Sequence, residues 1–87
     1  MDADLTTQYA AAVITAKGVP TKSLSNETKL MIYSLYKQAD VGPCNTERPG
    51  IFDQVGRTKW DSWKQLGDMS KEDAMRQYIE VVNAAYV

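Results

Sequence analysis

The segment Leu30-Met31-Ile32-Tyr33-Ser34-Leu35-Tyr36-Lys37-Gln38-Ala39 decides the fold, because its apolar residues recur at helical spacing. Residues three and four apart share a face of a helix, so Tyr33, Tyr36 and Lys37 form one patch, with Leu30 beside it. The opposite face has the spacing of a buried stripe, with the members Thr28, Met31, Ile32, Leu35 and Ala39. We therefore predict a helix that buries one face and presents two aromatic rings and an ammonium group on the other.

A second aromatic segment, Lys59-Trp60-Asp61-Ser62-Trp63-Lys64, also has helical spacing. Lys59 and Trp63 are four apart, and the two tryptophans are three apart. A pocket that combines aromatic rings with ammonium groups suits a ligand with a flat ring and a phosphate. We expect Trp63 to lie in the core and Trp60 at the rim of such a pocket.

Two further segments, near the two ends of the chain, complete a set of four predicted helices. The first helix runs from Leu5 to Gly18, the second ends near Ala39 or Val41, and the third covers about 55–66. Ser25 is placed to cap the second helix, and Ser70 with Asp73 forms a capping box for a fourth helix that extends to about Tyr86. The predicted inner stripe of that fourth helix is Met75, Ile79, Val82 and Tyr86.

The connection between the second and third helices is long, from Gly42-Pro43 to Asp53, and contains two prolines and two glycines. Loops of this length are uncommon in compact domains and are often functional. Such a crossover also lets the two helices that it joins pack in parallel. With no strand signal anywhere, the fold class is all-α, a four-helix bundle with a long loop between helices 2 and 3.

Composition limits the kind of protein. The 87 residues, 44% apolar and 24% charged, are expected to form a single domain, residues 1–87. A net charge of -1 gives no general attraction to nucleic acid or to an anionic surface. The N-terminus lacks a signal peptide and no apolar run is long enough for a membrane span, so we expect a cytoplasmic protein without stable membrane insertion.

Residues for catalysis are scarce. The chain has no histidine, which removes the commonest general base and metal ligand near neutral pH. Cys44 is the single cysteine, with no partner for a disulfide or a metal site. No carboxylate pair is placed for acid and base work, and the glycines mark turns rather than a phosphate loop. We expect a protein that is not an enzyme and has no metal site or cofactor.

Several blocks in order along the chain are similar to the acyl-CoA-binding protein family. They are Tyr33 to Gln38, Gly42, Asn45-Thr46-Glu47-Arg48-Pro49-Gly50, Lys59-Trp60-Asp61-Ser62-Trp63, Ser70-Lys71-Glu72-Asp73-Ala74-Met75 and Tyr78. The resemblance covers essentially the whole chain. It implies a bundle in an up-down-down-up arrangement that binds medium- to long-chain acyl-CoA as an intracellular carrier and pool-former, without transforming it.

The resemblance also implies roles for individual residues. Tyr33, Lys37 and Lys59 would hold the 3′-phosphate of the coenzyme, Tyr36 would stack on the adenine, and Tyr78 would complete the pocket wall.

Further positions are implied around these. Lys17 would add a cation, and Lys29 and Leu30, with Asn26, fall where the family lines the start of the site. Val55 departs from the family, whose members often have a lysine there.

Two other functions are compatible with the aromatic face. A helical protein-interaction module would use it to grip a partner helix. An accessory protein for nucleotide-binding enzymes would need only the adenine nucleotide. The expected partner is long-chain acyl-CoA, bound by a monomer, with no nucleic acid.

Overall fold

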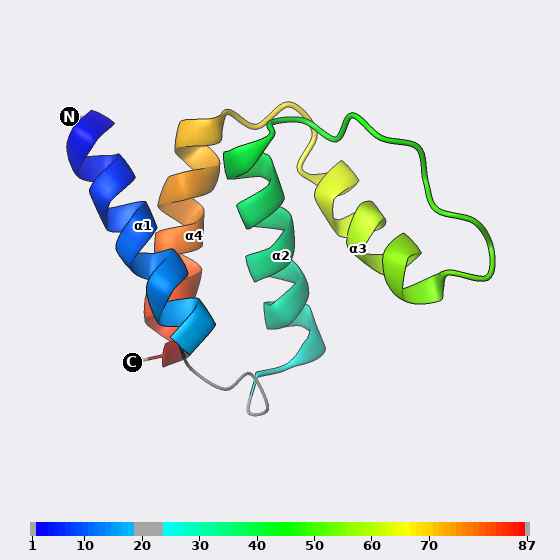
Figure 1. The fold of residues 1–87 in the computed structure, drawn as a ribbon, viewed down its shortest axis with the longest axis horizontal. Helices are drawn as coiled ribbons and strands as arrows, with labels where there is room; N and C mark the ends of the chain where they lie inside the picture. The colour runs from blue at the N-terminus through cyan, green and yellow to red at the C-terminus, as the bar shows by residue number, and fades with distance from the viewer. Residues whose placement is uncertain (1, 19–23, 87) are drawn as a thin grey trace.

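The computed structural model describes residues 2–18 and 24–86, with the side chains of 4–18 and 24–85. Its helices are α1 (Asp2–Gly18), α2 (Asn26–Asp40), α3 (Gln54–Gln65) and α4 (Lys71–Tyr86). α1 and α4 run in one direction, and α2 and α3 run in the other (Figure 1). The predicted all-α bundle with its up-down-down-up arrangement is therefore confirmed. The one notable difference from the predicted helix bounds is the start of α1, which lies at Asp2 instead of Leu5.

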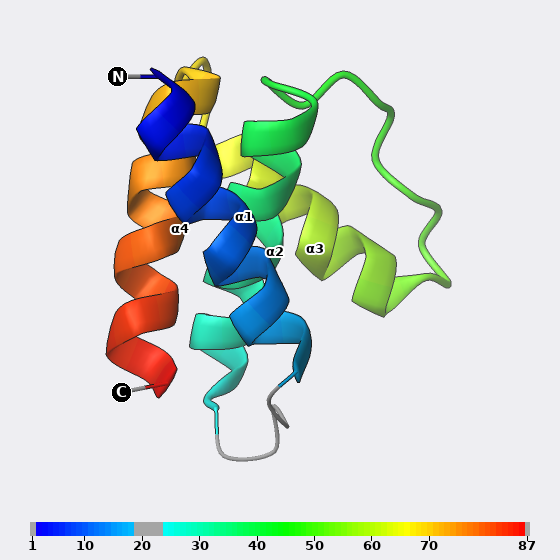
Figure 2. The ribbon, with the colours of Figure 1, turned by 60° about the vertical axis from the view of Figure 1, so that its left-hand side comes forward.

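Helices α4 and α2 each pack against two other helices. Helix α4 packs against both α1 and α2, and α3 packs against the other side of α2 (Figures 1 and 2). The buried core consists of Ala12, Leu35, Ala39, Ala74, Tyr78 and Val82. Within the described residues, α1 makes no close backbone contact with α2. Side chains rather than backbones therefore fill the space between these two helices.

The buried face of α2 is broader than its apolar stripe. Leu35 and Ala39 are buried as predicted, but the prediction for Met31 is wrong, because its side chain is 49% exposed. Ser34 and Gln38 are buried instead, because α3 and α4 both contact α2 and cover more than one stripe. The Ser34 hydroxyl donates to the Met31 carbonyl oxygen at 3.1 Å, so its burial leaves no unsatisfied donor.

Most of the predicted inner stripe of α4 is inside the molecule. Val82 is buried, and Met75 and Ile79 pack against the core. The side chain of Tyr86 lies outside the described residues.

The predicted helix caps are present. The Ser25 hydroxyl accepts from the Thr28 amide, and the Ser70 hydroxyl accepts from the Asp73 amide, each at 3.1 Å. The Asp73 carboxylate accepts from Arg76 at 2.8 Å, within α4. The serine half of the capping box is therefore made, while the acidic residue pairs along the helix.

The long loop between α2 and α3 is attached to α3 by side chains. Trp63 donates from Nε1 to the Gly42 carbonyl at 2.9 Å, and Trp60 donates to the Thr46 carbonyl at 3.0 Å. Arg57 donates to the carbonyl of Pro49 at 2.9 Å. These bonds satisfy loop carbonyls that have no partner in a helix or a sheet. Side chains of α3 therefore hold the loop that is visible in Figure 1.

Gln38 connects α2 to the turn before α4. Its side chain is completely buried, and Nε2 donates to the carbonyl oxygens of Gly67 at 3.1 Å and Met69 at 2.8 Å. We expect Gln38→Met to lower the free energy of unfolding by about 1 to 2 kcal/mol, because the carbonyls of Gly67 and Met69 lose their donor. Urea denaturation followed by circular dichroism measures this change. Gln77→Met, at an exposed position of α4, is the matched control, and an equal loss in both variants would contradict the assignment.

Candidate functional site

Three adjoining pockets follow one side of α2. The central pocket, of about 240 Å³, includes Tyr33, Lys37, Lys59, Trp60 and Trp63 in its lining. The tyrosine pocket, of about 300 Å³, lies toward α1 and includes Lys17, Tyr33, Tyr36 and Tyr78. The apolar pocket, of about 360 Å³, lies toward the start of α2 and is lined by Asn26, Lys29, Leu30, Val55, Thr58 and Lys59. Because Tyr33 and Lys59 each line two of these pockets, the three form one continuous surface.

The central pocket combines two cations with aromatic rings. Lys37 Nζ lies 5.0 Å from the centroid of the Trp63 ring, and Lys59 Nζ lies 5.3 Å from the Tyr33 ring. Both distances are typical of cation–π contacts. Glu47 is the acidic residue in this lining, so the two ammonium groups leave a positive excess. The pocket can accept an anion such as a phosphate through charge-assisted hydrogen bonds.

Trp63 and Trp60 lie as predicted from their spacing. Trp63 is buried, with 3% of its surface exposed. Trp60 is half-buried at the edge of the central pocket. Trp63 therefore forms part of the buried base of the pocket, whereas Trp60 forms part of its rim.

The tyrosine pocket is closed at its base by a cluster of rings. Tyr78 is buried between Tyr9, at 5.1 Å between ring centroids with an edge-to-face geometry, and Tyr36, at 6.4 Å. Tyr36 is half-buried and packs against the core, which differs from its expected position wholly on the face away from the core. Lys17 extends the pocket onto α1. The result is an aromatic cleft with a cation at its edge.

Tyr9 supports this cluster from α1 in its neutral form. Its hydroxyl is buried and has no hydrogen-bond partner among the residues that the structure describes. Burial, with smaller contributions from Tyr78, Tyr36 and Asp40, raises the pKa of Tyr9 well above its ordinary value. The phenol is therefore not available as a base near neutral pH.

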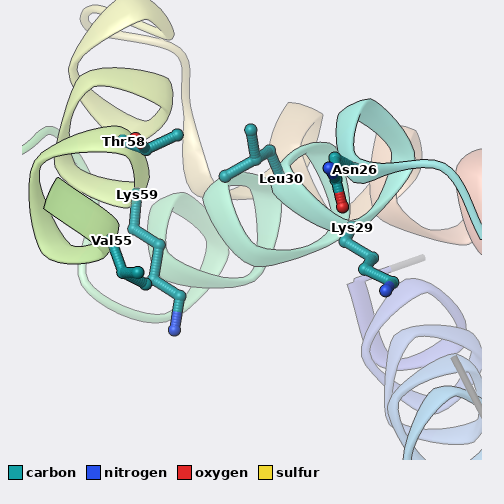
Figure 3. A pocket seen from close by; sticks show the side chains of 6 residues that line it. All are labelled: Asn26, Lys29, Leu30, Val55, Thr58 and Lys59. Carbon is teal, nitrogen blue, oxygen red and sulfur yellow. The ribbon is translucent and has the colours of Figure 1, made fainter. Parts of the chain in front are cut away.

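The apolar pocket lies between α2 and α3. Figure 3 shows Leu30 between two groups of side chains, with Val55, Thr58 and Lys59 of α3 on one side and Asn26 and Lys29 of α2 on the other. Thr58 donates its hydroxyl to the Gln54 carbonyl at 2.9 Å, so its methyl group remains for contact with a ligand. The middle of the pocket is apolar, and its ends carry amines.

Comparison with known proteins identifies the family. A profile of the family described as "Acyl CoA binding protein" matches residues 6–82. The chain belongs to the acyl-CoA-binding protein family. Fold and sequence agree, because the crystal structure of Oryza sativa Acyl-CoA-Binding Protein 2 superposes with a TM-score of 0.90 at 46% identity. That match covers 95% of this chain and 89% of the rice chain.

Relatives of two kinds are similar to this chain. "Acyl-CoA-binding domain-containing protein 1" from Oryza sativa subsp. japonica is 58% identical over 75 residues, which are 86% of this chain and 78% of that protein. "Acyl-CoA-binding domain-containing protein 5" from Xenopus tropicalis is 54% identical over 77 residues, which are 85% of this chain but 17% of the frog protein. The chain thus spans less than a fifth of the length of this larger member of the acyl-CoA-binding protein family.

All nine residues that the resemblance places at the site line the three pockets of this acyl-CoA-binding family member. They are Lys17, Asn26, Lys29, Leu30, Tyr33, Tyr36, Lys37, Lys59 and Tyr78. The pockets are also lined by residues that were not predicted to belong to them. Among these are Val13 and Ala16 of α1 and Val55 and Thr58 of α3. Val13, Ala16 and Lys17 share one face of α1 by their spacing of three and four, which is the signal that could have indicated them.

Neither a membrane span nor a metal site is found among the described residues. No helix in the part of the chain that the structure describes is both long and apolar enough to cross a membrane. Among the same residues, no group of three histidine, cysteine or acidic side chains is arranged to hold a metal ion.

Proposed function

We propose that this chain binds medium- to long-chain acyl-CoA esters and acts as an intracellular, cytoplasmic carrier and pool-former that catalyses no reaction. It acts as one domain and as a monomer, and residues 1–87 supply the whole binding site. The observation that carries the proposal is the position of Lys37 and Lys59 in a pocket between an aromatic cleft and an apolar cleft. An acyl-CoA ester presents its groups in a similar order: the flat base, the phosphates on and next to the ribose, and then the alkyl chain beyond the pantetheine arm.

Each pocket receives one part of the ligand in this proposal. Tyr33, Lys37 and Lys59 hold the 3′-phosphate in the central pocket. Tyr36 stacks on the adenine at the tyrosine pocket, whose wall is completed by Tyr78.

Two peripheral lysines and one leucine complete the assignment. Lys17 adds a cation from α1, and Leu30 contacts the acyl chain in the apolar pocket, with Lys29 at its end.

The two ends of the ligand contribute in different ways. Hydrogen bonds to a charged group contribute about 1.5 to 3 kcal/mol each, so the phosphate contacts distinguish the coenzyme from other anions. Burial of the alkyl chain contributes about 0.8 kcal/mol per methylene group. The head group therefore provides specificity, and the tail determines how affinity rises with chain length.

Calorimetric titration with palmitoyl-CoA, free coenzyme A and palmitate tests the proposal. We expect one-to-one binding of the ester and much weaker binding of the two fragments, because only the ester occupies all three pockets. Equal affinity for coenzyme A and its ester would instead favour an adenine-nucleotide binder. No heat with any of the three ligands would contradict the proposal and leave the aromatic face as a candidate protein interface.

A further inference from the structure

The end of the apolar pocket farthest from α3 is polar. Asn26 and Lys29 form this end, and Figure 3 shows Leu30 between them and the α3 side chains. An alkyl chain that enters beside Lys59 and passes Leu30 therefore reaches an amide and an ammonium group. A plain hydrocarbon tail makes no use of either group.

Both polar side chains are available for a ligand. In the described part of the chain, the side-chain ion pairs are Arg48 with Asp61 and Asp73 with Arg76, and Lys29 takes part in neither. Neither Asn26 nor Lys29 has a side-chain hydrogen bond within that same part. Their spacing of three residues places them on one face of α2, where one acceptor group can contact both.

We propose that the apolar pocket favours acyl-CoA esters whose acyl chain carries a carboxylate at its far end, such as the CoA monoesters of long-chain dicarboxylic acids. Lys29 pairs with the carboxylate and Asn26 donates to it from its amide nitrogen. Leu30 and Val55 contact the methylene groups in between. This inference rests on the proposed function, because it assigns the far end of the same bound ligand.

The surrounding charges are compatible with a carboxylate at this end. Lys59, at the opposite end of the pocket, is assigned to the phosphate, so Lys29 is the ammonium group of this lining that is left for the carboxylate. Glu27, in the first turn of α2, is exposed and is not part of the pocket lining. Lys29 is itself exposed, so its contribution is that of a surface ion pair and is sensitive to salt.

The test compares two ligands in two proteins. Dissociation constants for palmitoyl-CoA and for the CoA monoester of hexadecanedioic acid are measured in the wild-type chain and in Lys29→Met, at low salt. The ratio of the two constants removes effects common to both ligands. We expect Lys29→Met to shift this ratio about three- to fivefold against the dicarboxylic ester, as is typical of an exposed ion pair. Lys29→Glu should shift it further in the same direction.

Lys71→Met is the matched control, since Lys71 is an exposed lysine that lines none of the three pockets. It should leave the ratio at its wild-type value. An unchanged ratio in Lys29→Met would overturn the inference, and so would an equal loss of affinity for free coenzyme A, which would place Lys29 at the head group. Failure of palmitoyl-CoA to bind the wild-type chain would instead overturn the proposed function itself.

Discussion

Replacement of Lys59 by alanine is expected to weaken the binding of palmitoyl-CoA by about tenfold or more, equivalent to about 1.4 kcal/mol. Lys59 lines both the central and the apolar pocket, and its ammonium group lies 5.3 Å from the Tyr33 ring. In the proposed complex, its removal deletes a charge-assisted contact to the phosphate and leaves Glu47 opposed by Lys37 alone. Calorimetric titration of the variant measures the loss directly.

Lys37→Ala should produce a loss of the same order, because Lys37 is the other cation of the central pocket. Lys71→Ala, which removes an exposed lysine outside the pockets, should bind like the wild type. Because ion pairs are screened by salt, the effect of Lys59→Ala should also shrink as ionic strength rises. Wild-type affinity in both pocket variants would show that the phosphate lies elsewhere.

The largest effect on stability is expected at Trp63. Trp63→Ala should lower the free energy of unfolding by about 3 to 5 kcal/mol, the range found when a buried aromatic side chain is truncated. The side chain is 3% exposed, and its Nε1 donates to the Gly42 carbonyl at 2.9 Å. In a domain of this size, such a loss is a large part of the total stability.

A conservative variant separates packing from hydrogen bonding at Trp63. Trp63→Phe retains most of the ring volume but leaves the Gly42 carbonyl without its donor, so we expect a loss of about 1 to 3 kcal/mol. Urea denaturation followed by far-ultraviolet circular dichroism suits both variants, since it does not depend on tryptophan fluorescence. Equal stability of Trp63→Ala and wild type would mean that α3 and the loop are held by other contacts.

The helices were predictable from the sequence because their signals are local. Ser25 and Ser70 cap the helices that follow them, and each hydroxyl accepts from an amide three residues later. The end of α2 was predictable as well, since Gly42 has a φ of 100°, a conformation that glycine adopts without the strain imposed by a Cβ. The caps and the end of α2 depend only on residues that are close together in the sequence, so the sequence alone is enough to predict them.

The burial of polar residues was not predictable in the same way. Gln38 is a polar residue with nothing in its neighbourhood to indicate burial, yet it is completely enclosed. Its two acceptors belong to Gly67 and Met69, about thirty residues away along the chain. Met31 is the opposite case. It is apolar and has the spacing of the buried stripe, yet its side chain stays half exposed because α3 and α4 cover a different part of α2.

The sequence by itself determined the four helices, their caps and the family, and through the family resemblance it led to the eight residues proposed for the ligand. Only the tertiary structure decided that these residues line three pockets joined at Tyr33 and Lys59, and that Val55 and Thr58 complete the apolar pocket. The physical reason is the range of the interactions. Helix formation and capping depend on hydrogen bonds within a few residues, whereas a pocket depends on the packing of α4 against α1 and α2 and of α3 against α2.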